Sequence, residues 1–131
     1  MPRSSPPPPP TDAELEVLRV LWSHGPSTVR DVHEVLGAAK RTGYTTTLKL
    51  LQNMHAKALV ERDDGQRQHL YWATVEEEPT LRAVVRRLVD GVFNGSSAAL
   101  SMHALGSRRP SAEEIGELKA LLRQLEREAD G

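Results

Sequence analysis

The chain contains no cysteine and few aromatic residues. Its 131 residues include two tryptophans, two tyrosines and one phenylalanine. A chain without thiols has neither a disulfide framework nor a thiolate metal site. So few aromatic rings also give little lining for a small-molecule pocket. A regulator gated by a small ligand is therefore one of the weaker alternatives.

Sequence signals of catalysis, export and membrane insertion are also absent. The sequence has no nucleophile elbow, phosphate-binding loop or paired-carboxylate site, and nothing in it resembles a signal peptide or a membrane span. We predict a cytoplasmic protein that is not an enzyme, uses no cofactor and does not insert into a membrane. Five histidines lack the tight spacing of metal ligands, so no metal site is predicted. They are His24, His33, His55, His69 and His103.

Positive and negative charges nearly balance over the whole chain, which has a formal net charge of -1. The distribution is uneven, because Lys40 to Trp72 contains six lysines or arginines against three acids. Acidic residues gather at Glu76–Glu78 and near the C-terminus. The central region is therefore the part of the chain suited to a polyanion.

Prolines mark the organisation of the chain. Six of the nine lie in the first ten residues, and Pro26, Pro79 and Pro110 lie at predicted helix boundaries. We predict a disordered or polyproline tail over residues 1–10, which could also serve as a peptide ligand, then one domain over 11–75 and another over 76–131.

Two helices are predicted before residue 40. Thr11 and Glu14 have the spacing of a capping box. The first helix has an apolar stripe and ends at His24-Gly25-Pro26. Ser27 or Thr28 caps the second helix, and Gly37 marks its end. The apolar residues of the two helices are Leu15, Leu18, Leu21, Trp22, Val29, Val32, Val35 and Leu36.

A third predicted helix, beginning near Gly43, has two different faces. Apolar residues recur at steps of three and four, which indicates packing on a core. These residues are Leu48, Leu51, Met54 and Ala58, with Leu50 beside them. The opposite face carries hydroxyl, amide and basic groups. Its residues are Thr45, Thr46, Lys49, Gln52, Asn53 and Lys57.

Next comes a predicted β-hairpin. Alternating residues flank Asp63-Asp64-Gly65, a sequence typical of a hairpin turn. We expect Leu70 and Trp72 to anchor the hairpin to the helices, with Arg67 and His69 available to phosphates. Helix, turn, helix and hairpin in this order predict a winged helix-turn-helix DNA-binding domain.

Recognition helices contact base edges mainly through residues near their N-termini. We therefore predict that bases are contacted by Thr45, Thr46, Lys49 and Asn53. Phosphates are assigned to Thr28, Arg30, Lys40, Arg41 and Arg67. Two alternatives stay open: the polar face is an ordinary solvated surface, or the domain binds another protein and no DNA.

After residue 76 the sequence predicts further helices with more apolar side chains than about fifty residues can bury. One helix follows Pro79, an apolar segment spans Ala98 to Leu105, and Ser111 with Glu114 forms a second capping box. We predict a mainly α protein whose all-helical C-terminal domain forms a homodimer. An intramolecular cap on the winged domain is the alternative. The predicted interface residues are Leu81, Val84, Val85, Leu88, Val92, Phe93, Leu100, Ile115, Leu118, Leu121, Leu122 and Leu125.

These motifs together resemble the BlaI/MecI/CopY family of bacterial penicillinase-type repressors, over about residues 11 to 125. The resemblance is carried by short segments in both halves of the chain. They are Leu15 to Trp22, Pro26 to Val32, Tyr44-Thr45-Thr46, Tyr71 at the end of the wing, and Val92 to Ser96 before the capped acidic helix.

Resemblance to this family implies a winged-helix domain, a helical dimerisation domain and repression by a homodimer on a palindromic, double-stranded DNA operator. It also implies induction through a membrane sensor metalloprotease and cleavage in the dimerisation domain. Two departures limit what carries over. The Asn-Phe bond of cleaved relatives is absent from the comparable stretch, Ala99 to His103, and the cysteine cluster of copper-responsive relatives is missing.

Overall fold

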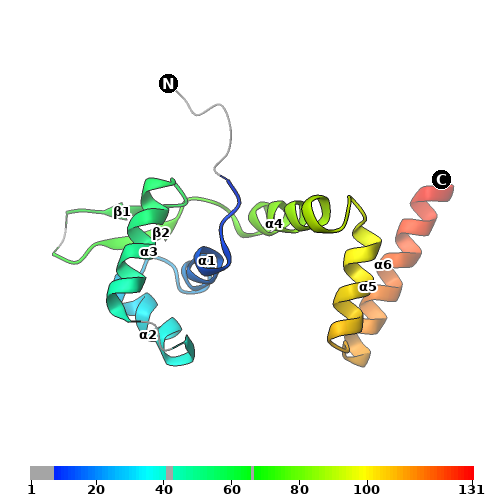
Figure 1. Ribbon diagram of the computed structural model, residues 1–131, viewed down its shortest axis with the longest axis horizontal. Coiled ribbons are helices and arrows are strands. Elements are labelled where there is room, and N and C mark those ends of the chain that lie inside the picture. The colour runs from blue at the N-terminus through cyan, green and yellow to red at the C-terminus, as the bar shows by residue number, and fades with distance from the viewer. Residues whose placement is uncertain (1–7, 41–42, 66) are drawn as a thin grey trace, which may run out of the picture. The chain divides into compact units, whose positions relative to one another are not determined.

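The computed structural model describes residues 8–40, 43–65 and 67–131, with only the backbone described for residues 38–40. The chain divides into two compact units, Met1–Arg87 and Leu88–Gly131 (Figure 1). Most of the expected N-terminal tail, residues 1–7, lies outside the described residues. Within the described part, Pro10 is buried immediately before the first helix.

Helix α1, Asp12–His24, begins where the capping box was predicted. The Thr11 hydroxyl accepts a hydrogen bond from the Glu14 amide at 3.3 Å, and the Glu14 carboxylate accepts one from the Thr11 amide at 2.9 Å. These two bonds satisfy amides that have no partner within the helix. At the other end, Gly25 has φ 80°, a left-handed conformation that glycine adopts without strain.

Helix α2, Val29–Lys40, is capped by Thr28. The Thr28 hydroxyl accepts from the Asp31 amide and the Asp31 carboxylate accepts from the Thr28 amide, both at 3.1 Å. The prediction that Gly37 ends this helix is wrong, because the helix continues to Lys40. Glycine costs about 1 kcal/mol relative to alanine inside a helix. Val35, predicted to be buried, is 46% exposed.

Helix α3, Tyr44–Ala56, ends two residues earlier than the apolar pattern predicted. Ala58 has φ 66°, and the Leu59 amide donates to the Met54 carbonyl at 2.9 Å. This is the arrangement of a left-handed helix end, here built on alanine in place of the usual glycine. It turns the chain so that Leu59 and Val60 enter the core.

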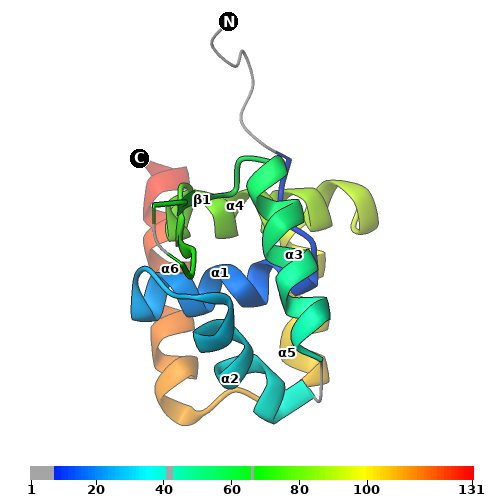
Figure 2. The ribbon, with the colours of Figure 1, turned by 90° about the vertical axis from the view of Figure 1, so that its left-hand side faces the viewer.

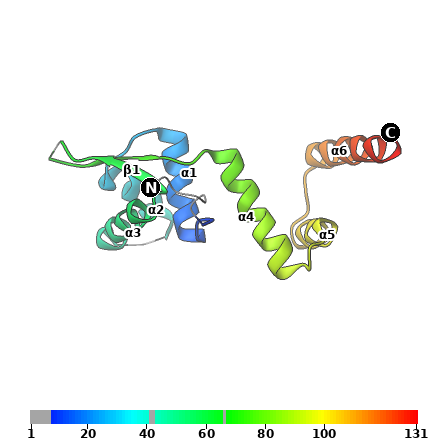
Figure 3. The ribbon, with the colours of Figure 1, turned by 90° about the horizontal axis from the view of Figure 1, so that it is seen from above.

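Strands β1, Val60–Asp63, and β2, Leu70–Ala73, form the predicted antiparallel hairpin, which extends outward from the helices (Figures 1 and 3). Its facing was predicted wrongly, because Tyr71 is 1% exposed and Trp72 is 37% exposed. Ser27 explains the difference. Its amide donates to the Tyr71 carbonyl and its carbonyl accepts from the Tyr71 amide, which fixes Tyr71 over the core. Because side chains alternate along a strand, a shift of one residue exchanges the core-facing side chains with the solvent-facing ones.

One hydrophobic core joins the three helices and the base of the hairpin. Its fully buried side chains come from all of these elements. Trp22 adds a tie, because its indole Nε1 donates to the Val75 carbonyl at 2.9 Å. The largest core side chains are Tyr71, Leu18, Leu51, Met54 and Leu59. The third helix is therefore fixed on its apolar side, which leaves the other side free.

Helix α4, Glu77–Val92, begins before Pro79. The prediction that it starts after Pro79 is therefore wrong. Proline is tolerated there because a first-turn amide has no partner within the helix. The chain then turns through Asn94 and Gly95, both with positive φ. The Gly95 amide donates to the Val89 carbonyl at 2.9 Å.

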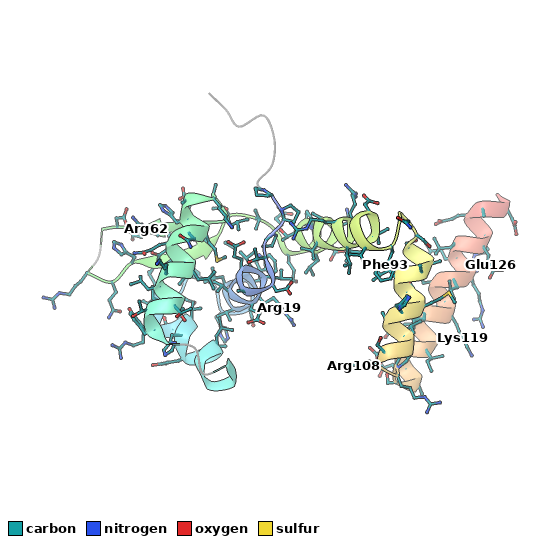
Figure 4. The ribbon with its side chains drawn as sticks, in the orientation of Figure 1. Arg19, Arg62, Phe93, Arg108, Lys119 and Glu126 are labelled. Carbon is teal, nitrogen blue, oxygen red and sulfur yellow. The ribbon has the colours of Figure 1, made fainter. Side chains whose placement is uncertain are left out.

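Two further helices complete the C-terminal unit. The apolar segment after Ser96 forms helix α5, Ser97–Ser107, and the predicted Ser111–Glu114 capping box opens helix α6, Ala112–Asp130. Phe93 and His103, the former labelled in Figure 4, bring the end of α4 against α5, with ring centroids 5.3 Å apart. No side chain of α5 or α6 is buried.

Candidate nucleic-acid interface

The exposed face of α3 is free of negative charge. Thr45, Thr46, Lys49, Gln52 and Asn53 are all exposed, as predicted, and no acidic residue occurs between Tyr44 and Ala56. Figure 2 shows α3 beside α2 and the hairpin in the N-terminal unit. Because Leu51 and Met54 are buried beneath it, this polar face is held on the surface by the core.

Three predicted phosphate ligands, Thr28, Arg30 and Arg67, line one hollow of about 160 Å³. It lies between the first turn of α2, the first turn of α3 and the start of β2. Tyr44, Leu48, Gln68 and His69 complete the lining, together with Val29. These three residues were predicted to contact phosphates, but a shared hollow was not predicted. Long-range packing brings them together.

Three cations of this interface have no ion pair with another described residue. In the described part of the protein, Arg30, Lys49 and Arg67 have neither a salt bridge nor a side-chain hydrogen bond. An unpaired cation can approach a phosphate without first giving up a carboxylate partner. Lys57, which the helical pattern also placed on the polar side, is different. Its ammonium group lies 2.7 Å from the Glu14 carboxylate.

The two aspartates near the hairpin tip are held by neighbouring groups. Asp64 Oδ1 lies 2.8 Å from Arg62 Nε and 2.8 Å from His69 Nδ1, and Asp63 Oδ1 accepts from the Gly65 amide at 2.8 Å. Arg62, labelled on the hairpin in Figure 4, also donates to the Tyr71 hydroxyl at 3.4 Å. That hydrogen bond, with the Asp64 charge, raises the pKa of Arg62. The charge of Asp64 is thus partly offset by Arg62, whereas Asp63 only accepts a backbone hydrogen bond.

Two predicted phosphate ligands cannot be placed in this interface. Arg41 lies outside the described residues, and Lys40 is the last residue of α2 with only its backbone described. In contrast, Tyr44 and Gln68 line the hollow although neither was predicted to contact DNA. Tyr44 is 46% exposed at the start of α3. An exposed aromatic residue at the first position of a recognition helix is the signal that could have indicated it.

The predicted dimer residues form apolar faces on the last three helices. Along α6, Ile115, Leu118, Leu122 and Leu125 follow steps of three and four, the spacing of an apolar seam. Leu122 is 59% exposed, and Val92 at the end of α4 is 66% exposed. The remaining predicted residues are exposed or half-buried, namely Leu81, Val84, Val85, Leu88, Phe93, Leu100 and Leu121. Faces of this kind are suited to a partner surface.

Metal and membrane sites are not evident in the described part of the chain. Residues 8–40, 43–65 and 67–131 contain no cluster of three or more potential metal ligands. Within the same ranges, no helix combines the length and apolar composition needed to cross a membrane.

Three helices followed by a two-stranded wing define this protein as a winged helix-turn-helix protein. The family model described as "Penicillinase repressor" matches residues 10–124. The chain belongs to this family of transcriptional repressors, which are not enzymes.

The chain is similar to several known relatives and solved structures. The transcriptional regulator BlaI of Mycobacterium tuberculosis is 36% identical over 118 residues, covering 88% of this chain and 83% of the relative. The penicillinase repressor of Bacillus licheniformis is 24% identical over 114 residues, covering 87% and 89%. Among solved structures, a mutant of Staphylococcus aureus MepR bound to an oligodeoxyribonucleotide gives 22% identity and a TM-score of 0.48, covering 91% and 79%.

Proposed function

We propose that the protein is a homodimeric repressor that occupies a palindromic DNA operator. The observation that carries this proposal is the exposed, acid-free face of α3 beside a hollow lined by Arg30 and Arg67, which have no ion pair among the described residues. The major groove is about 12 Å wide and admits an α-helix, whose diameter with side chains is about 10–12 Å. We place α3 in that groove.

Base contacts are assigned to Thr45, Thr46, Lys49 and Asn53. All four are exposed on α3. Asparagine can pair with the N6 and N7 atoms of adenine, lysine can donate to guanine, and the threonine methyl can contact the thymine methyl. These groups match base edges, whereas an ordinary solvated helix face needs no such set.

Phosphate contacts are assigned to the hollow beside α3. Arg30 approaches it from α2 and Arg67 from the hairpin, so a single phosphodiester strand can contact both while α3 lies in the groove. Thr28 keeps a hydroxyl proton to donate, because the oxygen accepts from Asp31 in the helix cap. Lys40 and Arg41 remain proposed ligands from the α2–α3 connection.

Dimerisation is assigned to the apolar faces of α4, α5 and α6. Burying one leucine or valine side chain contributes roughly 1.5–3 kcal/mol, so several exposed ones favour association strongly. The partner is a second copy, since a two-fold symmetric protein matches a palindromic site and places two recognition helices in successive major grooves. The family model extends through most of this region, because it matches residues 10–124.

Release from the operator is proposed to follow cleavage by a membrane sensor metalloprotease. Separating the two winged domains would remove the gain in affinity that linkage provides. The bond that is cut is not assigned, because Ala99 to His103 contains no Asn-Phe pair. Any bond in the exposed segments around α5 would have the same effect on affinity.

The test is a gel shift with the purified protein and the promoter region of its own gene, with titrations of salt and competitor DNA. The proposal expects nanomolar binding that resists random competitor and weakens steeply with salt, because phosphate contacts release condensed cations. Binding no tighter than to random DNA would overturn it. A salt-insensitive interaction with a protein would then favour the alternative of a winged helix that binds protein partners.

A further inference from the structure

The contact between α2 and α3 contains a cluster of three side chains, His33, Thr47 and Tyr44. His33 lies on α2, half-buried, and Thr47 lies on α3 with only 3% of its surface exposed. Nδ1 of His33 is 3.5 Å from the Thr47 hydroxyl oxygen. The ring of His33 also meets the ring of Tyr44 edge-on, with centroids 5.9 Å apart and planes at 82°.

Gly37 leaves room for the His33 ring. One turn after His33 on the same helix, it leaves the space that the imidazole occupies. A Cβ atom added at residue 37 would lie 2.9 Å from Cε1 of His33, closer than side-chain carbons approach. The ring would have to move away, and the two α3 contacts would move with it. The same packing accounts for a glycine inside α2.

We propose that His33 is a positioning residue that fixes the rotation of α3 about its own axis. This inference rests on the proposed DNA-binding function. Thr47 is buried, and Thr45 and Thr46 precede it by two residues and one residue, so the orientation of Thr47 determines theirs. Side chains reach about 5–6 Å from a helix axis, so a rotation of about 10° moves their ends by about 1 Å. Hydrogen bonds to bases tolerate less than that.

His33 supports the recognition helix from two directions with two kinds of contact. The polar contact to Thr47 is directional, whereas the aromatic contact to Tyr44 restrains the first residue of α3. Buried leucines such as Leu51 supply most of the packing energy, but apolar packing is not directional. Orientation of α3 is therefore the property that should respond to changes at His33.

The experiment separates the two contacts with two variants. His33→Asn can place an amide near the position of Nδ1 but lacks the ring, whereas His33→Phe keeps a ring and lacks the polar atom. His33→Ala removes both, and His24→Asn, on the far end of α1, is the matched control. The quantity to measure is the ratio of affinities for operator and random DNA, at a temperature where circular dichroism shows every variant folded.

We expect His33→Ala to lower this ratio at least fivefold, equivalent to losing one base contact, with each single-contact variant intermediate. His24→Asn should leave it unchanged. Gly37→Ala supplies a second arm, because alanine favours a helix yet displaces the ring. A lower ratio in this variant without a lower helix content supports positioning. An unchanged ratio in both His33→Ala and Gly37→Ala would overturn it.

A measurement without DNA distinguishes this inference from the proposed function. In α3, the amides of Thr46 and Thr47 donate to the Gly43 carbonyl at 3.1 and 3.2 Å. If His33 holds this turn, their hydrogen exchange should accelerate in His33→Ala relative to amides of α1. If exchange is faster in His33→Ala but the wild-type protein binds no operator, positioning stands and the repressor proposal is refuted. Unchanged exchange would refute positioning.

Discussion

Glu14 and Lys57 join the start of α1 to the end of α3 through an ion pair of 2.7 Å. The Glu14 carboxylate is buried, with 4% of its side chain exposed, whereas the Lys57 side chain is 43% exposed. One carboxylate oxygen accepts from the Thr11 amide and the other from the Lys57 ammonium. A single side chain thus completes a helix cap and a tertiary contact.

This pair predicts how stability depends on pH. Burial raises the pKa of Glu14, but hydrogen bonds from Lys57 and Thr11 and the Lys57 charge outweigh it, so the pKa lies below its ordinary value of 4.5. A lowered pKa in the folded state adds stability above pH 4.5, which is lost as the pH falls through the folded value. The free energy of unfolding of wild type minus that of Glu14→Gln should therefore be larger at pH 6 than at pH 3. A difference independent of pH would contradict the assignment.

Removing the cation should leave the buried carboxylate uncompensated. Lys57→Met is expected to lower the free energy of unfolding by about 1–3 kcal/mol, less than for a fully buried pair because Lys57 is partly exposed. Urea unfolding at pH 7 measures it. Lys49→Met is the control, since Lys49 lies exposed on the same helix without a partner among the described residues. Equal losses in the two variants would show that the ion pair contributes nothing specific.

Substitution of Thr46 and Lys49 by alanine should weaken operator binding without moving the unfolding midpoint. Each base contact contributes roughly 1–3 kcal/mol, so the double variant should bind the operator at least about tenfold more weakly. Its affinity for random DNA should fall much less. Gel shifts with both DNAs, beside thermal unfolding, check this. Unchanged operator affinity would remove these residues from the interface.

Arg67 should behave as a phosphate ligand and not as a base ligand. Arg67→Ala is expected to weaken binding to operator and random DNA alike and to lower the slope of log affinity against log salt by about 0.9. Arg19→Ala offers a control, because Arg19 is exposed on α1 away from the hollow around α3. A loss confined to the operator would instead indicate a base contact.

Replacing Ala58, just after α3, by glycine should stabilise the folded protein. Ala58 has φ 66°, a conformation that costs an L-residue about 1–2 kcal/mol and glycine almost nothing. After the entropy that glycine adds to the unfolded chain, Ala58→Gly is expected to raise the free energy of unfolding by about 0.5–1 kcal/mol. Ala56→Gly, at the last residue of α3, should not raise it, because Ala56 has no positive φ that glycine would relieve. Destabilisation by both would mean that Ala58 does not hold this conformation.

Loss of apolar residues on α6 should dissociate the proposed dimer. Leu122→Gln with Leu125→Gln is expected to raise the dimer dissociation constant at least about tenfold, since each leucine contributes roughly 1.5–3 kcal/mol when buried. Arg123→Gln with Glu126→Gln introduces the same residues at neighbouring positions and should have little effect. Sedimentation equilibrium measures both. Wild-type monomers at micromolar concentration would refute the dimer itself.

Local patterns in the sequence determined much of this protein. Threonine at residue 11 and serine at residue 111, each followed three residues later by glutamate, predicted helix starts that the structure has. The alternation of apolar and polar residues predicted the exposed face of α3. These features depend on groups within about one helical turn, so neighbouring residues suffice to specify them.

Tertiary structure alone decided the rest, because it depends on residues far apart in the chain. The backbone of Ser27 turned Tyr71 inward and reversed the expected facing of the hairpin. The buried Glu14 carboxylate is paired with Lys57, which lies forty-three residues away in the sequence. Thr28, Arg30 and Arg67 meet around one hollow only after the core has formed. Each outcome is a choice between local alternatives of similar energy, which packing and long-range hydrogen bonds resolve.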